Sequence, residues 1–152
     1  QVVSLIQELR ERAVHPLLVG VDQEGGRVSR LPWPGLTFPG AMALGYLNDE
    51  DTTFRVSRAI AEQLDALGFD TAFAPSLDVN NNPNNPIIGV RSYGEDPERV
   101  ARHGLAAIRG FAEGGLLPVV KHFPGHGNTD QDSHLELPTQ PASREELECV
   151  EL

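Results

Sequence analysis

Apolar residues recur at three-to-four spacing in several stretches of the chain, and this period predicts amphipathic helices. The pattern is clear at residues 2–13, 51–67 and 97–113. Asp51 is the expected N-cap of the second stretch, and Pro97 takes the favoured first position of the third, directly after Asp96. A fourth helix is expected to open at Ser143, because Ser143 and Glu146 have the spacing of a capping box.

Short continuous apolar runs lie between these helices, at residues 17–21, 71–74 and 116–120. Continuous rather than alternating runs are typical of parallel strands that are covered on both faces. The turns before the runs are short and rich in glycine, whereas the loops after them are long and polar. In a (β/α) barrel this asymmetry marks the active face, at the carboxyl ends of the strands. A doubly wound sheet shares the alternation, but no Gly-x-Gly-x-x-Gly follows a strand to support a dinucleotide crevice.

Length and composition narrow the fold and the class of function. The 152 residues, 39% hydrophobic and 22% charged, describe an ordinary globular protein. A TIM-type (β/α)8 barrel commonly needs about 250 residues, so we expect residues 1–152 to be a fragment of a single barrel domain with about half of its strands. The formal charge of −10 argues against nucleic acid or an anionic membrane as partner, because both need a basic surface.

Ionisable residues concentrate at 121–134, Lys-His-Phe-Pro-Gly-His-Gly-Asn-Thr-Asp-Gln-Asp-Ser-His, directly after the third apolar run. Such groups at the end of a buried strand are costly unless a ligand or a partner charge compensates them. Polar residues also follow the other two runs, and we expect all of them at one mouth: Asp22, Gln23, Glu24, Arg27, Arg30, Asp78 and Arg91. Carboxylates that accept from vicinal hydroxyls, beside cations that donate, indicate a polyhydroxylated ligand. A structural ion pair is an equally good interpretation of Glu24 and Arg27.

The histidines of this region do not have the spacing of a metal site. His122, His126 and His134 lack a His-Glu-x-x-His or comparable helical arrangement, and Lys121 beside them would repel a cation. We therefore expect neither a metal nor a cofactor. His126, which lies between two glycines, is expected to be a structural histidine bonded to backbone, and the Asn-rich run at 80–86 is expected to form turns.

Four sequence blocks lie in order along nearly the whole chain, at residues 22–28, 78–80, 88–97 and 121–134. Together they resemble glycoside hydrolase family 3. The last block adds Pro-Gly-His-Gly and Asp-x-His to Lys-His-Phe, and this combination resembles, more narrowly, the β-N-acetylhexosaminidase branch of the family, the cell-wall-recycling N-acetylglucosaminidases.

This resemblance implies a retaining exo-β-N-acetylglucosaminidase that releases N-acetylglucosamine from peptidoglycan-derived saccharides or muropeptides through a glycosyl-enzyme. It implies a sugar subsite in which Asp22 binds the hydroxyls, completed by Arg30, Arg91, Lys121 and His122. It also implies an acid/base dyad of His134 and Asp132. A carboxylate raises the pKa of a nearby imidazole, so such a ring is protonated near neutral pH and can give its proton to the leaving oxygen. The expected location is the cytoplasm.

Retaining glycosidases also need a second carboxylate as nucleophile. The resemblance implies an aspartate on a later strand, beyond Leu152, so residues 1–152 alone are expected to be inactive and poorly soluble. Three alternatives remain open: another β-glycosidase of the family, a glycoside phosphorylase, or a non-catalytic sugar-binding remnant.

Overall fold

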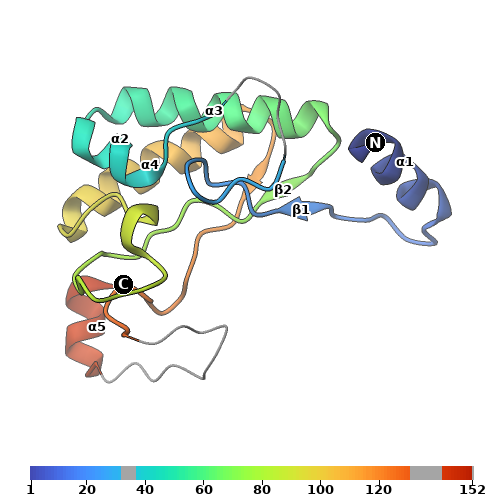
Figure 1. The fold of residues 1–152 in the computed structure, drawn as a ribbon. Helices are drawn as coiled ribbons and strands as arrows, with labels where there is room; N and C mark the ends of the chain where they lie inside the picture. The colour runs from blue at the N-terminus through green and yellow to red at the C-terminus, as the bar shows by residue number, and fades with distance from the viewer. Residues whose placement is uncertain (32–36, 131–141, 152) are drawn as a thin grey trace.

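The computed structural model of the chain describes residues 1–31, 37–130 and 142–151. Three parallel strands form one sheet in the order of the sequence (Figure 1). They are β1 (Gly20–Val21), β2 (Thr71–Ala72) and β3 (Leu117–Pro118). The strands are shorter than the apolar runs that predicted them, but backbone hydrogen bonds extend the pairing beyond them, from Phe73 N–H to Val21 at 3.0 Å and from Val119 N–H to Ala72 at 2.9 Å. All three carboxyl ends therefore point to one edge.

The expected helices are present and alternate with the strands. Their bounds are α1 (Val2–Arg12), α3 (Glu50–Ala66), α4 (Pro97–Glu113) and α5 (Arg144–Val150). The capping box that opens α5 and the Asp96 cap of α4 are confirmed. The predicted N-cap of α3 was wrong: Asp49, not Asp51, caps the helix, because the Asp49 carboxylate accepts from Asp51 N–H at 3.1 Å.

Two short elements were not predicted, α2 (Ala41–Leu47) and the 3₁₀-helix η1 (Gly89–Arg91). A helix of seven residues spans only about two turns, too few for a hydrophobic period to be recognised. The approach of α2 to the rest of the fold depends on Gly45, where a Cβ would lie 1.8 Å from the Tyr93 carbonyl oxygen. The 3₁₀-helix η1 belongs to the loop that follows β2, and α2 lies beside it (Figure 1).

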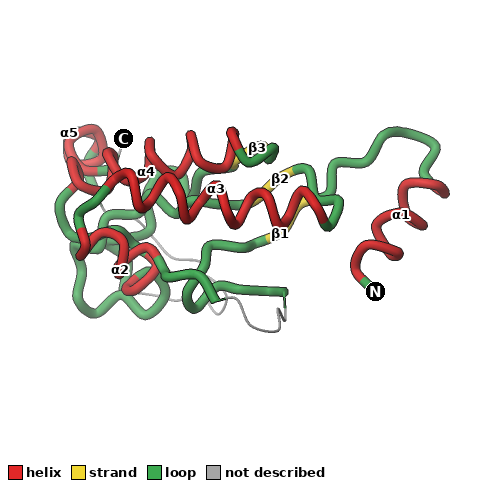
Figure 2. Tube along the Cα trace, turned by 90° about the horizontal axis from the view of Figure 1, so that it is seen from above, coloured by secondary structure: helices red, strands yellow, loops and turns green. Residues whose placement is uncertain are grey.

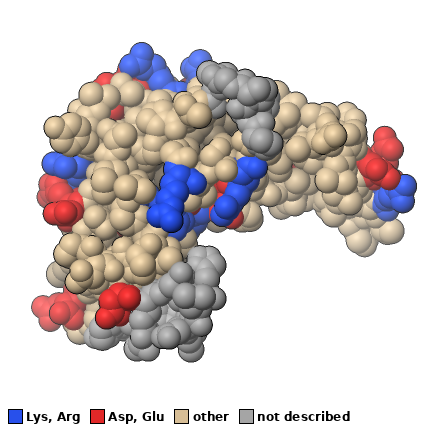
Figure 3. Space-filling model, in the orientation of Figure 1, with Lys and Arg blue, Asp and Glu red and all other residues tan. Residues whose placement is uncertain are grey.

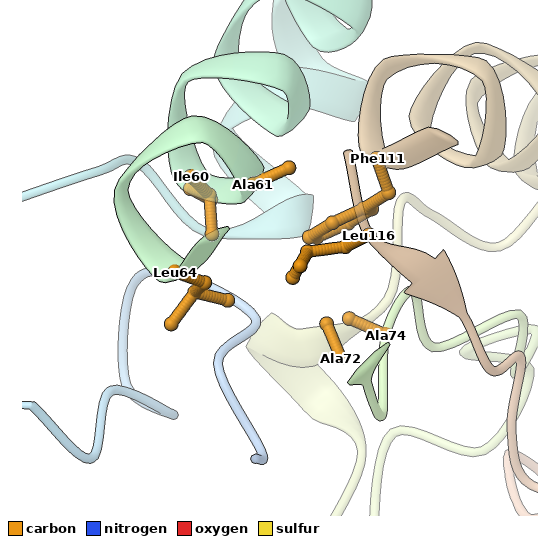
Figure 4. Packing of buried hydrophobic residues seen from close by; sticks show 7 residues of the cluster. All are labelled: Ile60, Ala61, Leu64, Ala72, Ala74, Phe111 and Leu116. Atoms are coloured by element: carbon orange, nitrogen blue, oxygen red, sulfur yellow. The ribbon is translucent and has the colours of Figure 1, made fainter. Parts of the chain in front are cut away.

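Helices α3 and α4 lie side by side over one face of the sheet (Figure 2). Seven buried side chains fill the space between these helices and the strands (Figure 4), namely Ile60, Ala61, Leu64, Ala72, Ala74, Phe111 and Leu116. This confirms the mixed α/β architecture with parallel strands and a helix after each strand. The core fixes the strand ends against which the polar loops are built.

The strand segments are not covered on both faces within the described part of the chain, as is expected of about half of a barrel. Apolar side chains of these segments stay open to solvent: Leu18 is 78% exposed, Leu117 59% and Val120 47%. Helices α3 and α4 shield only the face they pack on. Continuous apolar runs therefore predicted the strands correctly, although the second layer that would cover them is absent from the described residues.

Small residues let α3 and α4 approach closely, and Gly110 is the most constrained of them. A Cβ at Gly110 would lie 2.4 Å from the backbone oxygen of Phe54 on α3, which cannot move aside. We expect Gly110→Ala to lower the free energy of unfolding by about 1–3 kcal/mol, measured by urea denaturation. Gly104→Ala on the same helix is the matched control, because its Cβ would meet only the tip of Leu77, a side chain that can turn away. Equal stability of the two variants would contradict this account of the helix contact.

Candidate active site

A cleft of about 440 Å³ opens at the carboxyl ends of the three strands. All five residues predicted to bind sugar line it, namely Asp22, Arg30, Arg91, Lys121 and His122. Apolar side chains complete the lining, among them Phe73 and Ile87. Basic side chains gather near the middle of the face drawn in Figure 3. The shared mouth that the sequence predicted is therefore present.

A tight turn after β1 places Asp22 in this cleft and Glu24 behind it. Glu24 N–H donates to the Val28 carbonyl oxygen at 2.9 Å, which folds the chain back on itself. Gly25 and Gly26 both have positive φ angles, of 85° and 55°, which favour glycine. A Cβ at either position would also lie 2.7 Å from backbone of the 39–40 segment. The Gly-Gly pair thus allows two acidic side chains to follow the strand closely.

Two carboxylates hold the ammonium group of Lys121. Lys121 Nζ lies 2.6 Å from Asp22 Oδ1 and 2.6 Å from Glu24 Oε1. Glu24 also receives both arms of a guanidinium fork, with Arg91 Nη2 at 2.8 Å and Arg91 Nε at 3.0 Å. The position of Lys121 itself is fixed by its backbone, whose carbonyl accepts from Leu77 N–H at 2.7 Å. Ion pairs therefore connect residues that follow each of the three strands.

A third carboxylate, that of Asp78, orients His122. Nδ1 of His122 lies 2.5 Å from Asp78 Oδ2, and Nε2 lies 3.3 Å from Arg91 Nη2. Asp78 is fully buried and also accepts from the Ser76 hydroxyl at 2.8 Å and from His126 N–H at 2.7 Å. Because a guanidinium only donates, the neutral Nδ1–H tautomer of His122 satisfies both neighbours. The sequence placed Asp78 at the mouth but did not reveal this pairing.

The cations keep the buried carboxylates ionised. Burial opposes ionisation of Asp22, but the hydrogen bond and charge of Lys121, with the charges of Arg30 and Arg91, hold its pKa below the ordinary value. Burial likewise disfavours the charged form of Glu24, and hydrogen bonds from Arg91 and Lys121 outweigh it and lower the pKa. For Asp78, burial is outweighed by His122, by Ser76 and by the His126 backbone, so its pKa is also lowered.

These lowered pKa values predict that the fold loses stability in acid. The ordinary pKa values are 3.8 for Asp and 4.5 for Glu, and Asp22, Glu24 and Asp78 all titrate lower in the folded chain. Their contribution is therefore present above about pH 5 and is lost as the pH falls through the lowered folded values. We expect the thermal unfolding midpoint to drop below about pH 4. Asp78→Asn should be less stable at neutral pH and should show a shallower acid decrease; an unchanged slope would contradict this origin.

Arg30 and His126 occupy the edge of the cleft. The Arg30 side chain is exposed, and its backbone N–H donates to Gln23 Oε1 at 2.8 Å. His126 was expected to be bonded to backbone. Its backbone N–H donates to the Asp78 carboxylate at 2.7 Å, its ring Nδ1 lies 2.6 Å from the Thr129 hydroxyl, and it lines the cleft with the predicted sugar-binding residues.

The Asn-rich run has a role that turn chemistry alone did not suggest. Asn85 Oδ1 accepts from Ile87 N–H at 2.9 Å and Ile88 N–H at 2.7 Å, which forms the expected turn. Its amide nitrogen then donates to the backbone oxygens of His126 at 2.7 Å and Gly127 at 3.1 Å. Asn85 thereby ties the loop after β2 to the loop after β3. The contact joins residues more than 40 positions apart, so no local pattern could reveal it.

Some predicted site residues are not placed by the structure. Asp132 and His134 lie outside the described residues. Glu24 does form ion pairs, with Arg91 and Lys121, as the structural interpretation expected, whereas Arg27 is exposed and is in none of the ion pairs seen among the described residues. Within residues 1–31, 37–130 and 142–151, no group of three or more His, Cys, Asp or Glu side chains could hold a metal ion. No helix of the described chain is long and apolar enough to cross a membrane.

Comparison with known proteins gives a consistent family assignment. Residues 1–152 match the family described as glycosyl hydrolase family 3 N terminal domain. The chain is 42% identical over its whole length to β-hexosaminidase A of Pseudoalteromonas piscicida, of which it covers 27%. A family 3 β-N-acetylglucosaminidase from Paenibacillus sp. FPU-7 superposes with a TM-score of 0.95 at 50% identity, over 99% of this chain and 29% of that one.

A third relative was solved with a sugar analogue. NagZ from Neisseria gonorrhoeae in complex with N-trifluoroacetyl-D-glucosamine superposes with a TM-score of 0.90 at 38% identity, over 99% of this chain and 46% of that one. The chain thus spans less than half the length of each of these three relatives.

Proposed function

The chain belongs to glycosyl hydrolase family 3, and on this premise we propose that it forms the sugar subsite of a retaining exo-β-N-acetylglucosaminidase. The observation that carries the proposal is the cleft itself. Its five predicted sugar-binding side chains come from the ends of three different strands and line one space. The names of the relatives, β-hexosaminidase and β-N-acetylglucosaminidase, support the same substrate class.

The charge balance of the site favours a neutral, hydroxylated ligand. Around the cleft the three cations, Arg30, Arg91 and Lys121, are matched by three carboxylates, those of Asp22, Glu24 and Asp78. An anionic ligand such as phosphate would need a surplus of positive charge here, which this set does not supply. A sugar ring, by contrast, offers hydroxyl donors to the carboxylates and acceptors to the cations.

Each residue then takes a role that its surroundings allow. Asp22, 42% exposed in its side chain, accepts from sugar hydroxyls while Lys121 keeps it ionised. Arg91, Lys121 and His122 donate to sugar oxygens or orient the groups that do. Following the family resemblance, His134 protonates the leaving oxygen and Asp132 supports its charge. None of the described carboxylates is assigned as nucleophile: Asp78 is fully buried, and Glu24 is held by two cations.

The proposed substrate is a β-linked N-acetylglucosamine at the non-reducing end of a peptidoglycan-derived saccharide. The test is turnover of 4-nitrophenyl N-acetyl-β-glucosaminide by the full-length chain, meaning residues 1–152 together with the rest of the expected barrel domain. The matching glucoside is the control. We expect preference for the N-acetylated sugar and release of the β-anomer, observed by NMR, as retention requires. Preference for the glucoside, or release of the α-anomer, would overturn the proposal.

Phosphorolysis is the second candidate, and the same assay separates it from hydrolysis. A phosphorylase would turn over faster with added phosphate and would release a sugar 1-phosphate. Because Arg91 and Lys121 are already paired with carboxylates, we expect the rate and the product to be the same with and without phosphate. Accumulation of sugar 1-phosphate would contradict the hydrolase assignment.

A further inference from the structure

Glu24 lies behind the cleft rather than in it. Its side chain is 8% exposed, and it is absent from the residues that line the 440 Å³ space. Asp22, two positions earlier on the same turn, lines the cleft and is 42% exposed in its side chain. The two carboxylates of this turn therefore have different surroundings, and only Asp22 is placed to meet a ligand.

Both oxygens of Glu24 are engaged by cations. Oε1 accepts from Arg91 Nη2 at 2.8 Å and from Lys121 Nζ at 2.6 Å, and Oε2 accepts from Arg91 Nε at 3.0 Å. A buried carboxylate is retained at this depth only when such partners compensate its lost hydration. Among the described residues, Glu24 is the carboxylate that contacts both cations, since Asp22 pairs with Lys121 and Asp78 with His122.

The two cations line the cleft and connect Glu24 to other polar residues of the site. Lys121 continues the chain of contacts to Asp22, and Arg91 continues it to His122 and so to Asp78. The charges alternate in sign from Asp22 through Lys121 and Glu24 to Arg91, so Glu24 lies between the two cations. Long side chains of lysine and arginine have many rotamers, so a fixed position in an open cleft requires an anchor.

We propose that Glu24 is a positioning residue that holds Arg91 and Lys121 where they bind the sugar, an inference that rests on the proposed function. Without the Glu24 charge, the guanidinium loses its fork and Lys121 is left with Asp22 alone. Asp22 is then drawn into a one-to-one pair and is less available to sugar hydroxyls. Substrate binding then weakens.

The test is the kinetics of Glu24→Gln in the full-length chain with the aryl N-acetylglucosaminide. We expect KM to rise at least about tenfold, with kcat changed much less, because binding in the ground state and in the transition state weakens together. Glu24→Asp, which keeps the charge but shortens the reach, should give an intermediate KM. Glu50→Gln is the matched control, since Glu50 forms an exposed ion pair with Arg102 at 3.0 Å, far along the sequence from the cleft residues.

A double-mutant cycle with Lys121→Met distinguishes positioning from a general structural role. If Glu24 acts through Lys121, the Lys121→Met substitution raises KM less in the Glu24→Gln background than in the wild type. Equal factors in both backgrounds, or an unchanged KM in Glu24→Gln, would overturn the inference. If circular dichroism shows that Glu24→Gln does not fold, the Glu24→Asp variant is measured in its place. A wild-type KM in Glu24→Asp would then overturn the inference. Failure of the proposed function is a separate outcome, because the wild type would then show no turnover.

Discussion

His134→Ala in the full-length chain should lower kcat for a disaccharide substrate by about 10²–10⁴-fold, the usual contribution of a general acid or base. A sugar alkoxide is a poor leaving group and needs a proton as the glycosidic bond breaks. A nitrophenolate leaves without one, so the same variant should lose much less activity in the bond-breaking step with the nitrophenyl substrate. The measurement is the ratio of the two losses, by steady-state kinetics on both substrates.

The control for this prediction is His15→Ala. His15 is exposed in the segment before β1 and is not among the residues that line the cleft, so its loss should leave both substrates unaffected. Equal losses of His134→Ala on the nitrophenyl and disaccharide substrates would count against the acid role. The alternative of a sugar-binding remnant predicts a different pattern: ligand would bind by calorimetry, while His134→Ala would change no measurable property.

Asp22→Ala should lower kcat/KM by about 10²-fold or more, mainly through KM. Two causes act together. The variant removes an ionised acceptor for sugar hydroxyls, and it leaves Lys121 with Glu24 as its single acidic partner among the described residues. Each hydrogen bond to a charged group contributes about 1.5–3 kcal/mol. Losing both the bond to the sugar and the bond to Lys121 should therefore cost more free energy than a substitution on the protein surface.

Asp51→Asn gives a matched comparison for Asp22→Ala. Asp51 pairs with Arg55 at 3.1 Å on the exposed side of α3, and such surface pairs contribute little. Calorimetric titration with N-acetylglucosamine measures binding directly and keeps it apart from chemistry. Normal affinity and normal kinetics in Asp22→Ala would remove Asp22 from the site.

Sequence periodicity predicted the existence and type of the long elements. Helices α3 and α4 have a sustained apolar stripe and a clear end signal, so they were predicted to within a residue or so of their bounds. The cap of α3 was misplaced because Asp49 and Asp51 are both good N-cap residues, and only the backbone geometry selects Asp49. Helix α2 was missed because its seven residues are stabilised by contact with the Tyr93 backbone rather than by a local pattern.

The site was predicted as a set of residues but not as a set of contacts. The position of Asp22, Arg91 and Lys121 after apolar runs was sufficient to place them at one mouth, because parallel strands share an edge. Their partners could not be predicted, since Glu24 to Arg91 spans 67 positions and Asp22 to Lys121 spans 99. Which carboxylate receives which cation depends on turn geometry and side-chain rotamers, and neither has a local sequence signal.

The long sequence separation of these ion pairs has a consequence for how the protein assembles. Asp22 precedes Lys121 by 99 residues, so the cleft forms only after three successive β/α units have packed together. A partly folded intermediate that contains the first two units would carry unpaired charges and no affinity for sugar. Ligand would therefore bind only the fully docked state, and added sugar should raise the melting temperature by an amount that grows with the logarithm of its concentration relative to its Kd.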